Sequence, residues 1–204
     1  MTDVKAKVQQ FFGAGIKREL AEGEVLLFPE MTGPIPISYL VSGRVLQYSI
    51  DDEGNRSIVN IFKPGAFFPL TVAINDASVA YFFEADTLVE VRQVDAVHVR
   101  DFLRREPEVT YDVLARVYRG LEGLLGRMTH LLSGDAKSKI LHELYILGQR
   151  FGTIVSNGVE VEVTAGKLAE MTGLTRETVS RTLKSLQHSD IVRLRRGVVT
   201  VLQP

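Results

Sequence analysis

The sequence contains no cysteine, and no run of apolar residues approaches the length needed to cross a membrane. Without cysteine the chain can form neither disulfide bonds nor a cysteine-ligated iron-sulfur cluster. The first ten residues, MTDVKAKVQQ, lack the apolar core of a signal peptide. These absences predict a cytoplasmic protein with no membrane contact and no resident cofactor. The length of 204 residues, with 45% hydrophobic and 24% charged residues, is typical of a globular chain of one or two domains.

The sequence also has little that would support catalysis. It contains no glycine-rich phosphate loop, no cluster of metal ligands, and no nucleophile with a base at a recognisable spacing. The four histidines fall in different segments, so each is predicted to be a surface or helix residue; they are His98, His130, His142 and His188. We therefore predict that the protein is not an enzyme and binds no metal.

Charge is distributed unevenly along the chain. The formal net charge is -1. Residues 164–204 contain seven lysines and arginines against three acidic residues, a net charge of +4, which leaves -5 for the remainder. A basic C-terminal segment on an acidic body predicts a nucleic-acid-binding domain attached to a part that senses or dimerises.

The most informative segment runs from Thr164 to Leu186, with the sequence TAGKLAEMTGLTRETVSRTLKSL. Its pattern predicts two short helices joined by a turn at Gly173, with Thr175 as the N-cap of the second helix. At about 100° per residue, one side of the second helix is apolar. The apolar side carries Val179, Leu183 and Leu186, and the opposite side carries Arg176, Glu177, Ser180, Arg181 and Lys184.

Two interpretations of that polar side follow from the residue types. In the major groove, arginine suits the two acceptors of guanine, and a carboxylate accepts from the cytosine amino group. Alternatively the side is a solvated helix face with salt bridges such as Glu177 to Arg181. The spacing alone favours neither interpretation.

The string RETVSR at Arg176 to Arg181, inside a helix-turn-helix pattern, is similar to the DNA-binding domain of the cyclic-AMP receptor protein/FNR family of bacterial transcription regulators. This resemblance implies that Arg176 and Arg181 read guanines and Glu177 reads a cytosine, usually in a half-site of TGTGA type. It also implies double-stranded DNA, a second copy of the chain and RNA polymerase as partners. The other expected DNA contacts are Thr164, Thr175, Ser180, Lys184, Arg195 and Arg196.

Two apolar runs flank the arginines at the end of the chain. The runs at 191–194 and 198–201 predict a hairpin, or wing, with Arg195 and Arg196 at its tip. These arginines are predicted to contact phosphates, which positions the domain without reading sequence.

Short β-type runs separated by turns begin after Gly23 and continue to about residue 94, which predicts an antiparallel sandwich or barrel. Helical spacing precedes these runs near residues 4–13 and follows them at 97–103. The turns at 42–45 and 63–67 are similar to those of the family's jelly-roll sensor domain. The predicted fold class is thus α+β, with a jelly roll at 1–106, a dimerisation helix at 107–133 and a winged helix-turn-helix at 134–204.

The sequence departs from cyclic-nucleotide-binding members of the family. Those members have a glycine-glutamate pair after the Pro-Gly turn and later an Arg-Ser or Arg-Thr pair. This chain has FFPL at 67–70 and SVAYFF at 78–83. Because an unpaired buried phosphate costs several kcal/mol, we predict no tight binding of cyclic AMP and an effector that is still to be identified.

An aromatic cluster lies in these same segments. It consists of Phe67, Phe68, Tyr81, Phe82 and Phe83. A pocket for an apolar ligand or haem is one interpretation, and a filled β-domain core, which is favoured because aromatic residues dominate cores, is the other.

A long helix is predicted from Pro107 and Glu108 to about Leu132. One narrow apolar stripe follows it, consisting of Val113, Val117, Leu121, Leu124, Met128 and Leu131. The stripe packs either on the β-domain of its own chain or on a second copy of itself, and the resemblance favours the dimer. Gly120, Gly123 and Gly126 interrupt the helix, which indicates either close approach of another backbone or a soft joint.

The leading hypothesis is a homodimeric, sequence-specific transcription regulator controlled by an effector other than cyclic AMP. The alternatives are a constitutive or haem-dependent regulator of the same fold, and a dimeric interaction module without DNA affinity.

Overall fold

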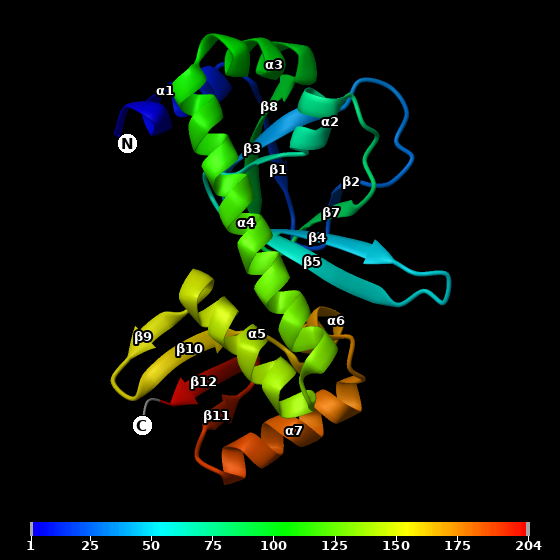
Figure 1. Ribbon diagram of the computed structural model, residues 1–204, viewed down its shortest axis with the longest axis vertical. Helices are drawn as coiled ribbons and strands as arrows, with labels where there is room; N and C mark the ends of the chain where they lie inside the picture. The colour runs from blue at the N-terminus through cyan, green and yellow to red at the C-terminus, as the bar shows by residue number, and fades with distance from the viewer. Residues whose placement is uncertain (1, 203–204) are drawn as a thin grey trace. The chain divides into compact units, whose positions relative to one another are not determined.

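The computed structural model describes residues 2–202, and contacts within the chain divide it into two units, residues 1–118 and 119–204. The division falls inside helix α4 (Pro107–Ser133). Proline at the first position of α4 is favourable, since its missing N–H has no partner there in any helix. The elements of both units are labelled in Figure 1.

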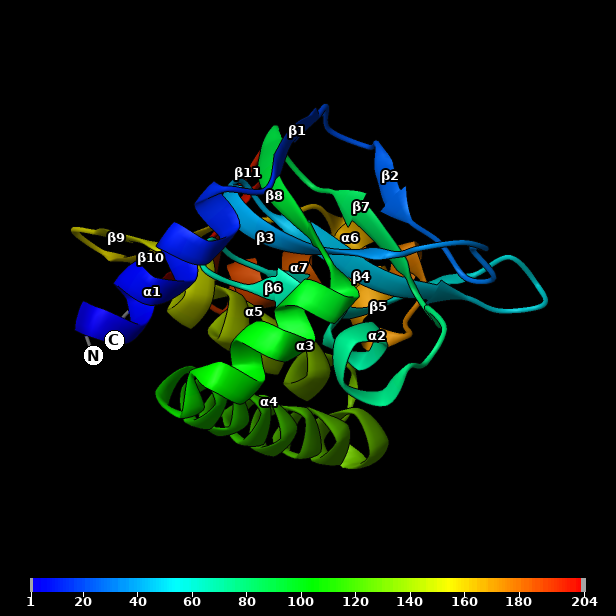
Figure 2. The same cartoon turned by 90° about the horizontal axis from the view of Figure 1, so that it is seen from above.

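The first unit contains two four-stranded antiparallel sheets, with strand orders β1-β8-β3-β6 and β2-β7-β4-β5 (Figure 2). The strands are β1 (Ile16–Leu20), β2 (Val25–Leu27), β3 (Pro36–Ser42), β4 (Val45–Ile50), β5 (Arg56–Phe62), β6 (Phe67–Phe68), β7 (Phe82–Ala85) and β8 (Val89–Asp95). Two sheets of this kind form the predicted jelly roll.

Two apolar clusters hold this unit together. The first contains buried side chains from both sheets, for example Leu40 of β3 and Phe83 of β7. In the second, the sheet containing β3 is covered by helices, and Phe12, Ile37 and Val109 are almost fully buried there. The covering helices are α1 (Thr2–Gly13), α2 (Leu70–Asn75), α3 (Ala96–Arg105) and the beginning of α4.

The second unit contains three further helices and one antiparallel sheet of order β11-β12-β10-β9. The helices are α5 (Ala136–Phe151), α6 (Ala165–Thr172) and α7 (Arg176–His188). The strands are β9 (Thr153–Val155), β10 (Gly158–Glu162), β11 (Val192–Arg195) and β12 (Val198–Leu202). Asp135 is the N-cap of α5, because its carboxylate accepts from the backbone N–H of Ser138 at 2.7 Å.

The α+β fold class and the order of its parts are confirmed. The elements that were not predicted are β1, β6, β9 and α2. Strand β1 has the sequence IKREL, in which three consecutive charged residues hide any alternation, as is common for strands at a sheet edge. Strands β6 and β9 have only two and three residues, which is too short for a pattern.

Candidate DNA-reading surface

Three caps define the ends of α6 and the start of α7. Thr164 accepts from the backbone N–H of Lys167 at 3.2 Å and begins α6. Gly173 ends α6 with φ of +68°, a left-handed conformation that favours glycine. Thr175 then accepts from the backbone N–H of Thr178 at 3.2 Å and begins α7. The predicted helix-turn-helix is therefore present, and Thr175 is its N-cap as expected.

Helix α7 is buried on one side and open on the other. Val179, Leu183 and Leu186 are buried, which fixes the rotation of the helix about its axis. The predicted base-reading residues Arg176, Glu177 and Arg181 are all exposed. Lys184 is also exposed and Ser180 is half-buried.

The alternative interpretation of this polar face required a salt bridge within α7. Within residues 2–202, Glu177 and Arg181 form no ion pair with each other, and neither do they pair with another side chain. Their hydrogen-bonding groups therefore remain available to an external partner. This geometry favours recognition of DNA over a self-satisfied helix face.

The wing is the hairpin of β11 and β12, with Arg196 and Gly197 in its turn. The carbonyl of Gly197 accepts from the backbone N–H of Val163 at 3.0 Å, which ties the turn to the segment before α6. Arg196 is exposed. Arg195 is exposed too, but its guanidinium forms an ion pair with Glu160 of β10. The two arginines were predicted as equivalent phosphate contacts, and they differ in this respect.

A groove of about 260 Å³ lies between the wing, the start of α6 and helix α7, which is the predicted recognition helix. Its polar lining comes from Thr164, Ser180, Lys184 and Arg195. These four residues were predicted separately as DNA contacts, and the fold brings them together around one groove.

Replacing Arg196 with alanine is expected to weaken binding to every duplex alike. It should reduce the slope of log affinity against log salt concentration by about one for each bound chain, and thus by about two for a dimer, because one phosphate contact is lost per chain. Arg195→Ala should reduce the slope less, since Glu160 already neutralises part of that charge. Salt titrations on a specific and a scrambled duplex measure both slopes. If Arg195→Ala and Arg196→Ala reduced the salt slope equally, the role given to Glu160 would be contradicted.

The five aromatic residues predicted as one cluster in the sensor unit do not form a single group. Phe68 and Phe83 are buried between the sheets, with their ring centroids 5.2 Å apart, and Phe62 stacks on Phe68 at 4.7 Å. Phe82 instead stacks on Tyr48 at 5.1 Å, and Tyr81 is exposed. Phe67 belongs to the cluster beneath the helices. For Phe67, Phe68 and Phe83 the filled-core interpretation is confirmed, whereas Tyr81 and Phe82 were wrongly placed with them.

Two of the four histidines, which the sequence separates, lie together in the second unit. The rings of His130 and His142 stack with centroids 3.9 Å apart. Burial lowers the pKa of His142 below its ordinary value, and the nearby His130 and Arg127 act in the same direction. Among residues 2–202, no group of three potential ligands is arranged to hold a metal ion.

The apolar stripe on α4 requires one correction. Val113 is 6% exposed and belongs to the core beneath the helices of the first unit, together with Val109 and Phe12. It is therefore not available to a second copy of the chain. The next members remain open to solvent in the single chain, with Leu121 47% and Leu124 41% exposed.

The exposed apolar face of α4 is also wider than predicted. Beyond Val117 and Met128, it includes Leu114, Tyr118, Leu125 and Leu132. With Leu114 in place of Val113, the apolar positions follow a heptad pattern of alternating steps of three and four residues. The two main rows are Leu114, Leu121 and Met128, and Val117, Leu124 and Leu131.

The three glycines of α4 lie along one side of the helix. A step of three residues turns the helix by about 300°, which leaves an offset of about 60°, so Gly120, Gly123 and Gly126 together cover an arc of about 120°. A Cβ added at any of them would find no atom of another described element within 4 Å. No close approach inside residues 2–202 therefore explains their presence.

Sequence reasoning missed one buried polar cluster. Arg127 of α4 and Glu143 of α5 form an ion pair, and Glu143 is only 1% exposed. A signal was available, because Glu143 lies at helical spacing from Ile140 and Leu147 on the buried side of α5.

A two-sheet sensor-like unit and a winged helix-turn-helix with an open recognition helix define a class of DNA-binding regulators. Comparison with known proteins agrees with this class. Residues 138–204 match the family model of the Crp-like helix-turn-helix domain, and residues 17–106 match that of the cyclic nucleotide-binding domain. The first match contains every predicted DNA-contacting residue.

Among curated relatives, the cAMP-activated global transcriptional regulator CRP of Haemophilus influenzae is 24% identical over 165 residues, covering 80% of this chain and 74% of the relative. Transcriptional regulator SdrP of Thermus thermophilus is 26% identical over 182 residues, covering 88% and 86%. The solved structure of the c-di-GMP responsive global regulator CLP of Xanthomonas campestris has a TM-score of 0.85 at 17% identity, covering 98% and 99%, which shows a shared fold.

The chain belongs to the CRP/FNR family and is a DNA-binding transcription regulator of that type. The similar proteins are transcription regulators and not enzymes. Within residues 2–202, no helix combines the length and apolar character that a membrane span requires.

Proposed function

We propose that the chain is a homodimeric regulator that reads a palindrome of TGTGA-type half-sites through Arg176, Glu177 and Arg181. The observation that carries this proposal is the state of these three side chains on α7. They are exposed on one helix and form no ion pair among residues 2–202, so no internal contact has to be broken before they bind base edges.

The exposed heptad face of α4 supports the dimer in this proposal. Leu121 and Leu124 each leave more than two fifths of their surface open in the single chain. Apolar rows at alternating steps of three and four residues are typical of helices that pair in parallel. A parallel pair is two-fold symmetric, and two-fold symmetry matches the symmetry of a palindromic site.

Fluorescence anisotropy with two duplexes tests the proposal. One duplex carries inverted TGTGA-type half-sites, and the other carries the same bases with both half-sites scrambled. We expect affinity for the first to be higher by about a thousandfold or more at physiological salt. Native mass spectrometry should show two chains per duplex. Equal affinity for the two duplexes would contradict sequence reading, and one chain per duplex would contradict the dimer.

The effector in this proposal is a molecule other than cyclic AMP. In the segment where nucleotide-binding members have an arginine, Val79 is 4% exposed and packs in the core with Phe68 and Phe83. No cationic group in that segment can neutralise a phosphate. We expect calorimetry with cyclic AMP to show no binding at micromolar concentrations, and a micromolar dissociation constant would overturn this expectation.

A further inference from the structure

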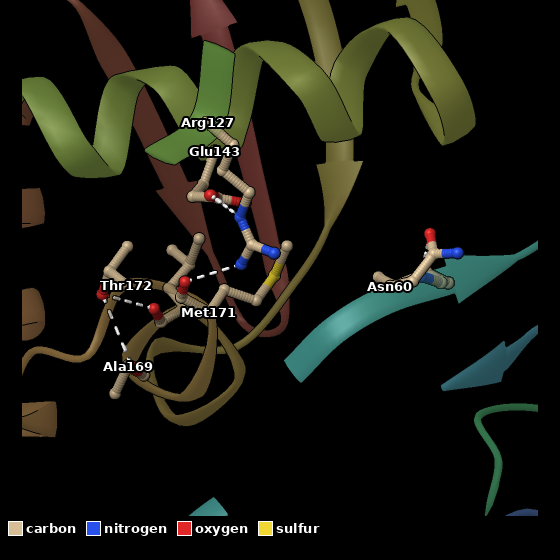
Figure 3. A network of polar contacts seen from close by, with 8 residues as sticks. Asn60, Arg127, Glu143, Ala169, Met171 and Thr172 are labelled. Carbon is tan, nitrogen blue, oxygen red and sulfur yellow. Dashed lines mark hydrogen bonds and ion pairs between the residues drawn. The ribbon is translucent and has the colours of Figure 1, made fainter. Parts of the chain in front are cut away.

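Arg127 lies in the part of α4 that belongs to the second unit, and it contacts α5 and α6 (Figure 3). Its side chain extends from α4 and is 14% exposed. Its Nε donates to Oε1 of Glu143 on α5 at 2.5 Å, and its Nη2 donates to the backbone carbonyl of Met171 on α6 at 2.6 Å. One planar guanidinium thus connects α4 to both helices.

Arg127 offsets part of the cost of burying the Glu143 carboxylate. Burial raises the pKa of the Glu143 carboxyl above its ordinary value, and the charge and hydrogen bond of Arg127 oppose that rise. Without Arg127 the carboxylate would be left buried and uncompensated, which is strongly destabilising. Arg127 therefore makes a structural contribution through Glu143 that any test must separate from a role in DNA reading.

The contact with Met171 lies at the start of the helix-turn-helix turn. The last carbonyls of a helix have no partner within the helix and carry partial negative charge. In α6, the carbonyls of Leu168 and Ala169 accept from Thr172 Oγ1 and from the backbone N–H of Gly173, at 2.6 and 2.9 Å. The Met171 carbonyl accepts from Arg127 instead. The position of this turn thus depends on a side chain from outside the helix-turn-helix.

Arg127 also adjoins the exposed apolar face of α4. Met128 follows it directly, and Leu124 and Leu131 lie three residues before and four residues after it. The same part of α4 therefore presents apolar side chains to solvent and a guanidinium to α6.

We propose that Arg127 is a positioning residue for DNA reading, which sets the orientation of α6 and hence of the recognition helix relative to α4. The inference rests on the proposed function, since orientation relative to α4 matters only when α4 places two recognition helices on one palindrome. In this arrangement the Glu143 carboxylate accepts from Nε of Arg127 and holds the guanidinium in place. The Met171 carbonyl accepts from Nη2 of the same guanidinium.

The double variant Arg127→Met/Glu143→Met separates positioning from stability. Replacing a buried ion pair by apolar side chains of similar size is often neutral for stability, so the urea midpoint should stay close to that of the wild type. The double variant does, however, lose the hydrogen bond to the Met171 carbonyl. We expect affinity for the palindromic duplex to fall about three- to thirtyfold. Without DNA, we expect amide hydrogen exchange at residues 171–175 to become about tenfold faster.

Arg119→Met is the matched control. Arg119 is an exposed arginine on α4 with no ion pair among residues 2–202, and its variant should match the wild type in all three measurements. If the double variant were stable and kept both wild-type affinity and wild-type exchange, Arg127 would have a structural role only and the inference would be wrong. If the wild type itself showed no sequence preference, the proposed function would fail, and exchange at residues 171–175 would still decide whether Arg127 holds the turn.

Discussion

Replacing Arg181 with alanine is expected to lower affinity for the palindromic duplex by about thirtyfold or more. A bidentate contact between arginine and guanine contributes about 1–3 kcal/mol of discrimination, and a dimer loses this contact in both half-sites. Arg181 is exposed and forms no ion pair among residues 2–202, so the fold should be unaffected. Anisotropy titrations on the palindrome, and on duplexes substituted at each half-site position, measure the loss and locate it.

Lys184→Ala is the control on the same helix. Lys184 lines the groove beside the wing and is expected to meet a phosphate, so its removal should weaken binding to specific and scrambled duplexes alike. Arg181→Ala should instead reduce the difference between the two duplexes. If the Arg181 variant kept its full sequence preference, the assignment of Arg181 to a guanine would be wrong.

The recognition helix α7 was predictable because the sequence features that define it are local. Thr175 as a cap and Val179 and Leu183 as a buried face lie within a few turns of one helix, where side-chain direction follows from spacing alone. The long strands of the sensor unit were predictable for a similar reason, since apolar residues mark them. Strand β1 was not, because its three consecutive charged residues, which are typical of a strand at a sheet edge, hide the alternation.

The contacts that were missed join residues far apart in the chain. The pairing of Arg195 with Glu160 spans two strands, and that of Arg127 with Glu143 spans two helices. Periodicity describes which way a side chain points, but it does not identify the partner that it meets. Val113 illustrates the same limit, because its helical spacing placed it on an apolar side of α4, but its burial in the core depended on where α1 and α3 pack.

Replacing Leu121 with glutamate is expected to dissociate the proposed dimer. In a parallel pair of α4 helices, Leu121 faces its own counterpart, so the variant would place two carboxylates side by side in an apolar seam. Burying unpaired charges of one sign costs several kcal/mol, and the dimer dissociation constant should rise by about a hundredfold or more. Analytical ultracentrifugation measures this change. Affinity for the palindrome should fall with it, since the two half-sites would then be bound independently.

Leu88→Glu provides the matched control, because Leu88 is 73% exposed and lies in the turn between β7 and β8, away from the heptad rows of α4. The Leu88→Glu variant should remain dimeric.

A second pair of variants tests the register of the seam. Leu114→Glu should behave as Leu121→Glu does, giving a folded monomer, whereas Val113→Glu should unfold the first unit because Val113 is buried in its core. A folded, monomeric Val113→Glu protein beside a dimeric Leu114→Glu protein would mean that Val113, and not Leu114, occupies the seam.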